Sequence, residues 1–286
     1  MNLPRLANFK LNKNMKLDSD SDEEMIEFDD RIPPTLKQQP EKKDFNQSGG
    51  DIINFYEQDS VKKFIHEYHN PSYNEKTQPL KHPARILVVG SSGAGKTNIV
   101  MNIIKKMENT FNKIRVFCKN KEEPLYEMLE SKLDGESFEI HEGLDELNSY
   151  NLNTEFSGQE LLIFDDLVLE KHQWQIEQLF IRGRKLSEKK GLTLIYLTQI
   201  YFKTPRDIRL QCDTLILKKL GSNRDVKAIL ADKDLGNLKA PQLLKMYEYC
   251  IDGNMTNFLL IDLASTQNKM FRNGFSQILN VSDFKL

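Results

Sequence analysis

Short, continuous runs of apolar residues alternate with amphipathic stretches from Ala84 onward. Five of these runs are rich in β-branched or aromatic side chains, and they predict strands at residues 85–89, 114–117, 160–164, 192–197 and 214–217. A further run, at 258–261, predicts the last strand. Strands that are apolar throughout and separated by helices are typical of a parallel sheet covered on both faces. The pattern therefore predicts an α/β fold with a mostly parallel sheet.

Between these runs the apolar residues recur at helical spacing. They predict helices over residues 97–107 and 125–133, and a third helix over 174–181.

The first part of the chain has a different pattern. Residues 1–50 contain few apolar runs, and Asp18–Glu24 form an acidic run that must stay hydrated, so we expect a disordered tail. Residues 51–80 are expected to form a helical arm that packs on the core or on a neighbouring subunit, and 81–286 the core domain. The arm helix is capped by Asp59-Ser60, ends before Pro71, and carries an apolar face made of Val61, Phe64, Ile65 and Tyr68.

Charge and cysteine usage narrow the classes of function. The net charge of the 286 residues is −2 and the pI is about 6.3, so nucleic acid can be attracted only by a local patch. The cysteines Cys118, Cys212 and Cys250 form no CxxC pair, which favours core thiols in a reducing compartment. No apolar stretch approaches about 18 residues, and no signal peptide is seen. We therefore expect a soluble, intracellular protein that does not enter a membrane.

One segment matches a phosphate-binding motif. It fits G-x-x-x-x-G-K-[ST] and lies between a predicted strand and a predicted helix; its residues are Gly90, Ser91, Ser92, Gly93, Ala94, Gly95, Lys96 and Thr97. The glycines let successive backbone N–H groups point at phosphate oxygens, and the helix adds its positive N-terminal end. Lys96 is expected to reach the β- and γ-phosphates of ATP, and Thr97 to offer its hydroxyl to Mg²⁺.

Polar residues follow two neighbouring apolar runs. The run at 160–164 ends in Asp165 and Asp166. A parallel strand delivers Asp165 to the carboxyl edge of the sheet, where it can hold Mg²⁺ through water. Asp166 either polarises the attacking water or caps the next helix. Gln199, at the end of the next strand, is either a sensor of the γ-phosphate or an ordinary loop amide.

Basic residues flank the Gln199 strand. Four of them are arginines: Arg182, Arg184, Arg206 and Arg209. In a ring of subunits, one of them could reach the ATP of a neighbouring subunit as an arginine finger. The alternative is that each is a solvated or ion-paired side chain. Five are lysines, which either form a basic surface for phosphate backbones or are solvated: Lys185, Lys189, Lys190, Lys218 and Lys219.

Taken in order, these motifs resemble those of the genome-packaging ATPases of large DNA viruses, virophages and related mobile elements, a branch of the FtsK–HerA superfamily. The resemblance covers roughly residues 80–265 and rests on His82-Pro83 to Thr97, Phe164-Asp165-Asp166, Arg182-Gly183-Arg184-Lys185, Tyr196–Gln199 and Pro205–Arg209. The chain departs from the family at Lys185, at Leu210-Gln211 and at Asp166, where relatives often have His, Asn and Glu.

The resemblance implies a RecA-like P-loop NTPase core that forms a homo-oligomeric ring and translocates double-stranded DNA into a capsid. It implies that Lys96 and Thr97 bind nucleotide and Mg²⁺, that Asp165 is the metal ligand, and that Asp166 is the catalytic acid position. Gln199 becomes the polar sensor. By the same resemblance, Arg184 or Arg209 is the trans-acting finger. Capsid proteins are then further partners, and the site of action is the viral assembly site of a host cell or the virion.

Two other functions fit the same residues. A P-loop kinase would transfer phosphate to a small acceptor, although two acids followed by a strand-end Gln favour water as the acceptor. A nucleotide-dependent switch would bind partners without hydrolysis, which an intact Asp166 argues against.

Overall fold

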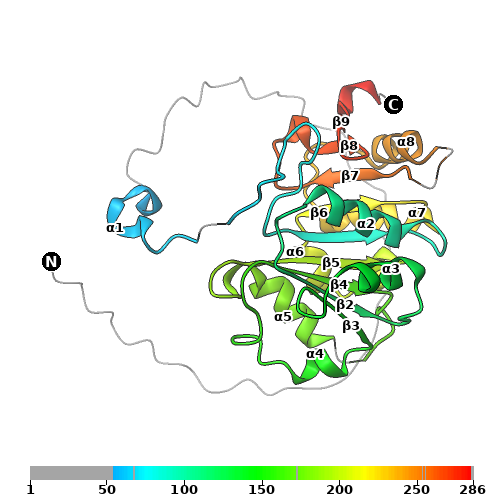
Figure 1. Ribbon diagram of the computed structural model, residues 1–286. Helices are drawn as coiled ribbons and strands as arrows, with labels where there is room; N and C mark the ends of the chain where they lie inside the picture. The colour runs from blue at the N-terminus through cyan, green and yellow to red at the C-terminus, as the bar shows by residue number, and fades with distance from the viewer. Residues whose placement is uncertain (1–53, 67, 172, 253, 255, 285–286) are drawn as a thin grey trace, which may run out of the picture. The chain divides into compact units, whose positions relative to one another are not determined.

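The computed structural model describes residues 54–66, 68–171, 173–252, 254 and 256–284 (Figure 1). Residues Phe55–Leu286 form one compact unit. The tail predicted over residues 1–50 lies outside the described residues, and the boundaries predicted at 50 and 80 stay predictions. None of the helices in the described ranges is both long and apolar enough to cross a membrane.

A mixed sheet forms the centre of this unit. Within the described ranges it has nine strands in the order β3-β2-β4-β5-β1-β6-β7-β8-β9. Neighbours from β3 to β6 pair in parallel, as predicted. The strands are β1 Arg85–Val89, β2 Lys113–Cys118, β3 Phe138–Glu142, β4 Glu160–Asp165, β5 Leu192–Thr198, β6 Thr214–Leu217, β7 Leu259–Asp262, β8 Phe271–Asn273 and β9 Gln277–Ile278.

Two details of the sheet correct the prediction. The run at 258–261 forms β7, which pairs antiparallel with β6 and is not the last strand, because β8 and β9 follow it in antiparallel pairs. Antiparallel strands need only short connections, so no predicted helix lies between β7, β8 and β9 to mark them as separate strands. β8 and β9 are also three and two residues long and carry Arg272, Asn273 and Gln277, so no apolar run marks them.

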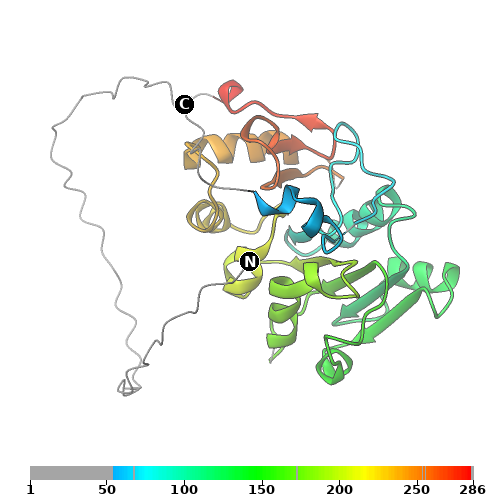
Figure 2. The same cartoon turned by 90° about the vertical axis from the view of Figure 1, so that its left-hand side faces the viewer.

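Helices cover both faces of the sheet, as the apolar strands predicted. Ile99, Val100 and Ile103 of α2 pack on one face together with α3, while α4 to α8 pack on the other. Figure 2 shows α2 (teal) and α8 (orange) on opposite sides of the strands. The longer helices are α2 Lys96–Lys106, α3 Pro124–Lys132, α4 Asp145–Ser149, α5 Trp174–Arg182, α6 Arg206–Gln211, α7 Asn223–Asp232 and α8 Ala240–Ile251. Short 3-10 turns are η1 Phe55–Glu57, η2 Gly183–Lys185, η3 Tyr201–Lys203, η4 Gln267–Lys269 and η5 Val281–Asp283.

The arm differs from its prediction. Its helix, α1 (Asp59–Lys62), has only four residues. Phe64 and Ile65 are 61% and 43% exposed, so they do not pack on the described core, and packing on a neighbouring subunit stays a prediction. A helix this short gains too few hydrogen bonds to offset its nucleation, so local spacing alone cannot sustain it. The segment that follows attaches to the core through hydrogen bonds: the Tyr68 hydroxyl donates to the Arg184 carbonyl at 3.0 Å.

The three cysteines are free thiols in the core, as their spacing suggested.

Candidate nucleotide-binding site

The predicted phosphate loop connects β1 to α2. Gly93 and Gly95 have φ angles of 70° and 82°, which side chains other than glycine adopt only at a cost. At Gly90 an added Cβ would lie 2.6 Å from the Cβ of Lys218, so the first glycine lets the loop pass close to the end of β6. The Ser91 N–H donates to the Lys219 carbonyl at 2.8 Å, which fixes the loop to the sheet edge.

Lys96 folds back over this loop. Its Nζ donates to the carbonyls of Gly90 and Ser91 at 3.0 and 3.3 Å. Burial lowers the pKa of Lys96, whereas the charges of Asp165 and Asp166 raise it. The ammonium group is therefore held, with compensating carboxylates, at the place where the motif expects phosphate oxygens.

Strand β4 delivers Asp165 to the same edge. The Tyr126 hydroxyl, from α3, donates to Asp165 Oδ2 at 2.8 Å. Burial raises the pKa of Asp165 to about 6, although the Tyr126 hydrogen bond and the Lys96 charge act in the opposite direction. Among the described residues no hydrogen bond reaches the other carboxylate oxygen of Asp165, which lines the pocket.

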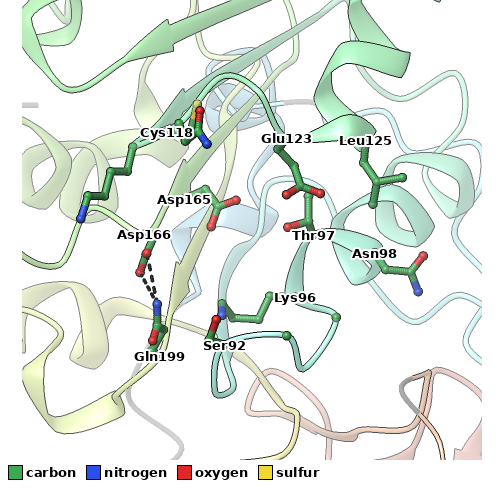
Figure 3. Close-up of a pocket in the computed structure, with 14 residues that line it drawn as sticks. Ser92, Lys96, Thr97, Asn98, Cys118, Glu123, Leu125, Asp165, Asp166 and Gln199 are labelled. Atoms are coloured by element: carbon green, nitrogen blue, oxygen red, sulfur yellow. Dashed lines mark hydrogen bonds between the residues drawn. The ribbon is translucent and has the colours of Figure 1, made fainter.

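Asp166 and Gln199 form a pair across the ends of β4 and β5. Gln199 Nε2 donates to both carboxylate oxygens of Asp166 at 3.1 Å (Figure 3). Asp166 has a φ of 58°, so the backbone turns sharply where β4 ends. Asp166 does not cap α5, which begins at Trp174 and has Gln173 at its N-cap. The catalytic role of Asp166 and the sensor role of Gln199 stay predictions.

One cavity, of about 550 Å³, joins these groups, a volume typical of small-ligand sites. It brings together the predicted Lys96, Thr97, Asp165, Asp166 and Gln199. Its complete lining is Ser92, Gly93, Gly95, Lys96, Thr97, Asn98, Cys118, Lys119, Asn120, Glu123, Leu125, Asp165, Asp166 and Gln199 (Figure 3).

The wall between Cys118 and Leu125 was missed in the sequence. It is the connection from β2 to α3, and it carries no motif. Because β2 lies beside β4, its carboxyl end lies next to Asp165, where the Lys119 N–H donates to the Asp165 carbonyl at 3.2 Å. The neighbouring order of β2 and β4 is the only signal that could have placed it, and that order is a tertiary feature.

The donor set suits a hydrated Mg²⁺. Thr97 offers a hydroxyl and Asp165 a carboxylate at the same cavity, and hard oxygen donors are what Mg²⁺ prefers. The described residues contain no cluster of three or more His, Cys, Asp or Glu side chains able to enclose a metal ion. An ion held here would thus take its other ligands from phosphates and water, as Mg²⁺ does in nucleotide sites.

The two predicted finger residues lie away from this cavity. Arg184 is exposed in η2, which precedes β5 and so lies at the amino edge of the sheet, opposite the pocket. Arg209 forms an ion pair with Asp232, and its side chain is only 13% exposed; its guanidinium also lies over the Tyr201 ring at 5.1 Å. Neither reaches the pocket of its own chain, and a role for Arg209 in a neighbour would require its ion pair to break.

The lysines do not form one basic surface, contrary to one of the two readings of the sequence. Lys218 is 1% exposed, and burial lowers its pKa to about 8. Lys218 and Lys219 follow β6 at the carboxyl edge, whereas Lys185, Lys189 and Lys190 precede β5 at the amino edge. Parallel strands place these two groups at opposite ends of the sheet.

The fold and the pocket define an α/β protein resembling the P-loop NTPases, with a candidate site for a nucleoside triphosphate. No family model matches the chain, and no curated protein matches it.

Among solved structures, the chain is similar to the genome packaging NTPase B204 of Sulfolobus turreted icosahedral virus 2 in complex with ATP-gammaS. The two sequences are 15% identical, and the alignment covers 72% of this chain and 100% of that chain, with a TM-score of 0.48. It is also similar to EssC (ATPases 2 and 3) of Geobacillus thermodenitrificans, with 13% identity, 63% of this chain and 38% of that chain covered, and a TM-score of 0.41. Similarity at these levels says nothing about a shared substrate or partner.

Proposed function

We propose that this chain binds ATP with Mg²⁺ and hydrolyses it. The observation that supports this most directly is the Asp166–Gln199 pair, with two hydrogen bonds of 3.1 Å, in the same cavity as Lys96 and Thr97. A carboxylate held by an amide beside a phosphate loop suits activation of water better than binding of an acceptor hydroxyl.

In this mechanism the protein supplies position and charge. Lys96 exchanges its bonds to the Gly90 and Ser91 carbonyls for bonds to phosphate oxygens. Thr97 and Asp165 would hold the metal ion, which would neutralise charge on the phosphates. Asp166 accepts the proton of the attacking water.

Gln199 couples nucleotide recognition to activation of the base. Its amide N–H groups are engaged by Asp166, and a γ-phosphate would compete for the same donors. When Gln199 turns to the phosphate, the Asp166 carboxylate is released to accept a proton. Water is then activated only when a triphosphate is present.

We propose further that hydrolysis drives translocation of double-stranded DNA by a homo-oligomeric ring that packages a viral genome into a capsid. The ordered motifs between His82 and Arg209 support this reading. So does the exposed Arg184 at the amino edge, because no arginine lines the cavity described above. A second copy would supply the missing guanidinium. Capsid proteins are the further partners, and the viral assembly site or the virion is the location.

The test is steady-state ATP hydrolysis with and without long linear double-stranded DNA, beside Lys96→Ala and Asp166→Asn. We expect DNA to stimulate hydrolysis and each substitution to abolish it, while Asp166→Asn still binds nucleotide. An ATP hydrolysis rate that DNA leaves unchanged at every protein concentration would contradict the proposed translocase function. Transfer of phosphate to a small acceptor would favour a kinase, and binding without turnover would favour a switch.

A further inference from the structure

The β2–α3 connection brings a third carboxylate to the nucleotide pocket. Glu123 lines the cavity together with Thr97 and Asp165. In Figure 3 the Glu123 carboxylate and the Thr97 side chain both point into this cavity, from the loop before α3 and from the start of α2. The sequence motifs assign no role to this residue.

The Glu123 side chain is not held by its own helix. It is the N-cap residue of α3, yet its side chain makes no capping hydrogen bond. Within the described ranges no lysine or arginine forms an ion pair with it either. The carboxylate is therefore turned towards the pocket instead of satisfying local structure.

The position of Glu123 is fixed by its neighbour Tyr126. Tyr126 lies one turn further along α3, is fully buried, and its hydroxyl holds Asp165 at 2.8 Å. The start of α3 is thus locked to the end of β4. The Glu123 charge also acts on Asp165: after burial, it is one of the influences that raise the pKa of that carboxyl.

Charge balance indicates what a third carboxylate can do here. The cavity is lined by three acids, Glu123, Asp165 and Asp166, and by two lysines, Lys96 and Lys119. A triphosphate adds more negative charge, so a free carboxylate at this place repels the nucleotide unless a cation lies between them.

We propose that Glu123 is a positioning residue for the Mg²⁺ of the bound nucleotide, accepting hydrogen bonds from the metal's water ligands beside Thr97 and Asp165. This rests on the proposed function. Partners that orient a metal's ligands are commonly worth about 10- to 100-fold in metal affinity.

The experiment measures binding of a non-hydrolysable ATP analogue to the full chain by calorimetry, across a Mg²⁺ series and in EDTA. The variants are Glu123→Gln and the matched control Glu122→Gln, whose exposed side chain does not line the pocket. For Glu123→Gln we expect about a tenfold rise in the Mg²⁺ concentration that gives half of the maximal effect of Mg²⁺ on analogue binding. In EDTA the same variant should bind the analogue at least as tightly as wild type, because a repelling charge has been removed. Glu122→Gln should change neither value.

Other outcomes overturn the proposal. Weaker binding of Glu123→Gln in EDTA would show a direct contact with ribose or base. An unchanged Mg²⁺ midpoint with lost turnover would make Glu123 the base that activates water. Thermal melting shows whether the variant folds, and Glu123→Asp, which keeps the charge, should give an intermediate midpoint. If wild type fails to bind the analogue with Mg²⁺, or Lys96→Ala binds it equally well, the proposed function itself fails.

Discussion

At the scale of single residues, Asp165 shows the conflict between folding and binding. Burial raises its pKa from the ordinary value of 3.8 to about 6. Below about pH 4 the group is protonated in both the folded and unfolded states and has no effect on stability. Between about pH 4 and 6 the unfolded chain loses this proton while the folded chain keeps it, so stability falls as pH rises. Above about pH 6 Asp165 is ionised in both states, and the full destabilisation caused by its buried charge is present.

Asp165→Asn should therefore stabilise the ligand-free protein above pH 6 while it abolishes hydrolysis. The gain is on the order of 1–3 kcal/mol, from the size of the shift. Urea unfolding of wild type and variant at pH 4 and pH 8 measures it, and the difference should be much smaller at pH 4. Equal differences at both values would show that the cost is not the buried charge.

Single residues also differ in how far the sequence reveals them. Lys96 and Thr97 belong to a contiguous motif whose geometry is local, so they could be assigned directly. Asp166 had two interpretations, because a residue after a strand can cap a helix. The start of α5 at Trp174 excludes capping, and the hydrogen bonds from Gln199 to Asp166 depend on the neighbouring ends of β4 and β5. Glu123 carried no signal, because its neighbours in the pocket are distant in sequence.

At the scale of elements, a buried arginine joins β2, β3 and β4 at the far edge of the sheet. The Arg115 side chain is 6% exposed and pairs with Glu160, which is 1% exposed, at 2.8 Å. It also contacts Glu139 at 3.0 Å and Glu155 at 3.1 Å. This network holds β2 in place and, through it, the β2–α3 wall of the pocket.

Arg115→Ala should lower the free energy of unfolding by about 3–5 kcal/mol, because it leaves the Glu160 charge buried without a partner. The matched control is Lys113→Ala on the same strand, whose ion pair with Glu139 is more exposed, at 21% and 28%. It should cost less than about 1 kcal/mol. Urea unfolding compares the two, and similar losses would mean that burial of the network contributes little.

Strands were predictable where both faces of the sheet are covered. β1, β4 and β5 are covered on both faces, so their central residues are almost all apolar and the runs are visible in the sequence. β3 could not be read in this way, because its sequence Phe138–Glu142 mixes acids and His141 with apolar residues. The arm helix is shorter than its spacing predicted, because nothing in the described core covers Phe64.

At the scale of the whole molecule, Arg184 and the pocket lie at opposite edges of one sheet. In a single copy they cannot meet. In a ring of copies the amino edge of one subunit can face the carboxyl edge of the next, which would complete the site with a guanidinium.

Mixing two inactive variants tests this arrangement. Arg184→Ala should bind nucleotide but lose turnover by roughly 10³-fold, as loss of an arginine finger does. Mixed with Lys96→Ala, which keeps Arg184, it should regain activity, because each variant supplies what the other lacks. Lys185→Ala, a change of the exposed neighbour, should stay active. Absence of recovery with Lys96→Ala, in mixtures shown to co-assemble, would overturn a role for Arg184 in trans.

The sequence by itself determined the phosphate loop, the apolar strands and the acids at the end of β4, because each depends on residues adjacent in the chain. Tertiary structure decided the strand order, the antiparallel edge, the pairing of Asp166 with Gln199, the burial of Lys218 and the ion pair of Arg209. It also placed Glu123 beside Thr97. These depend on which strand ends lie side by side, and that is set by the packing of both sheet faces at once, so no local pattern records it.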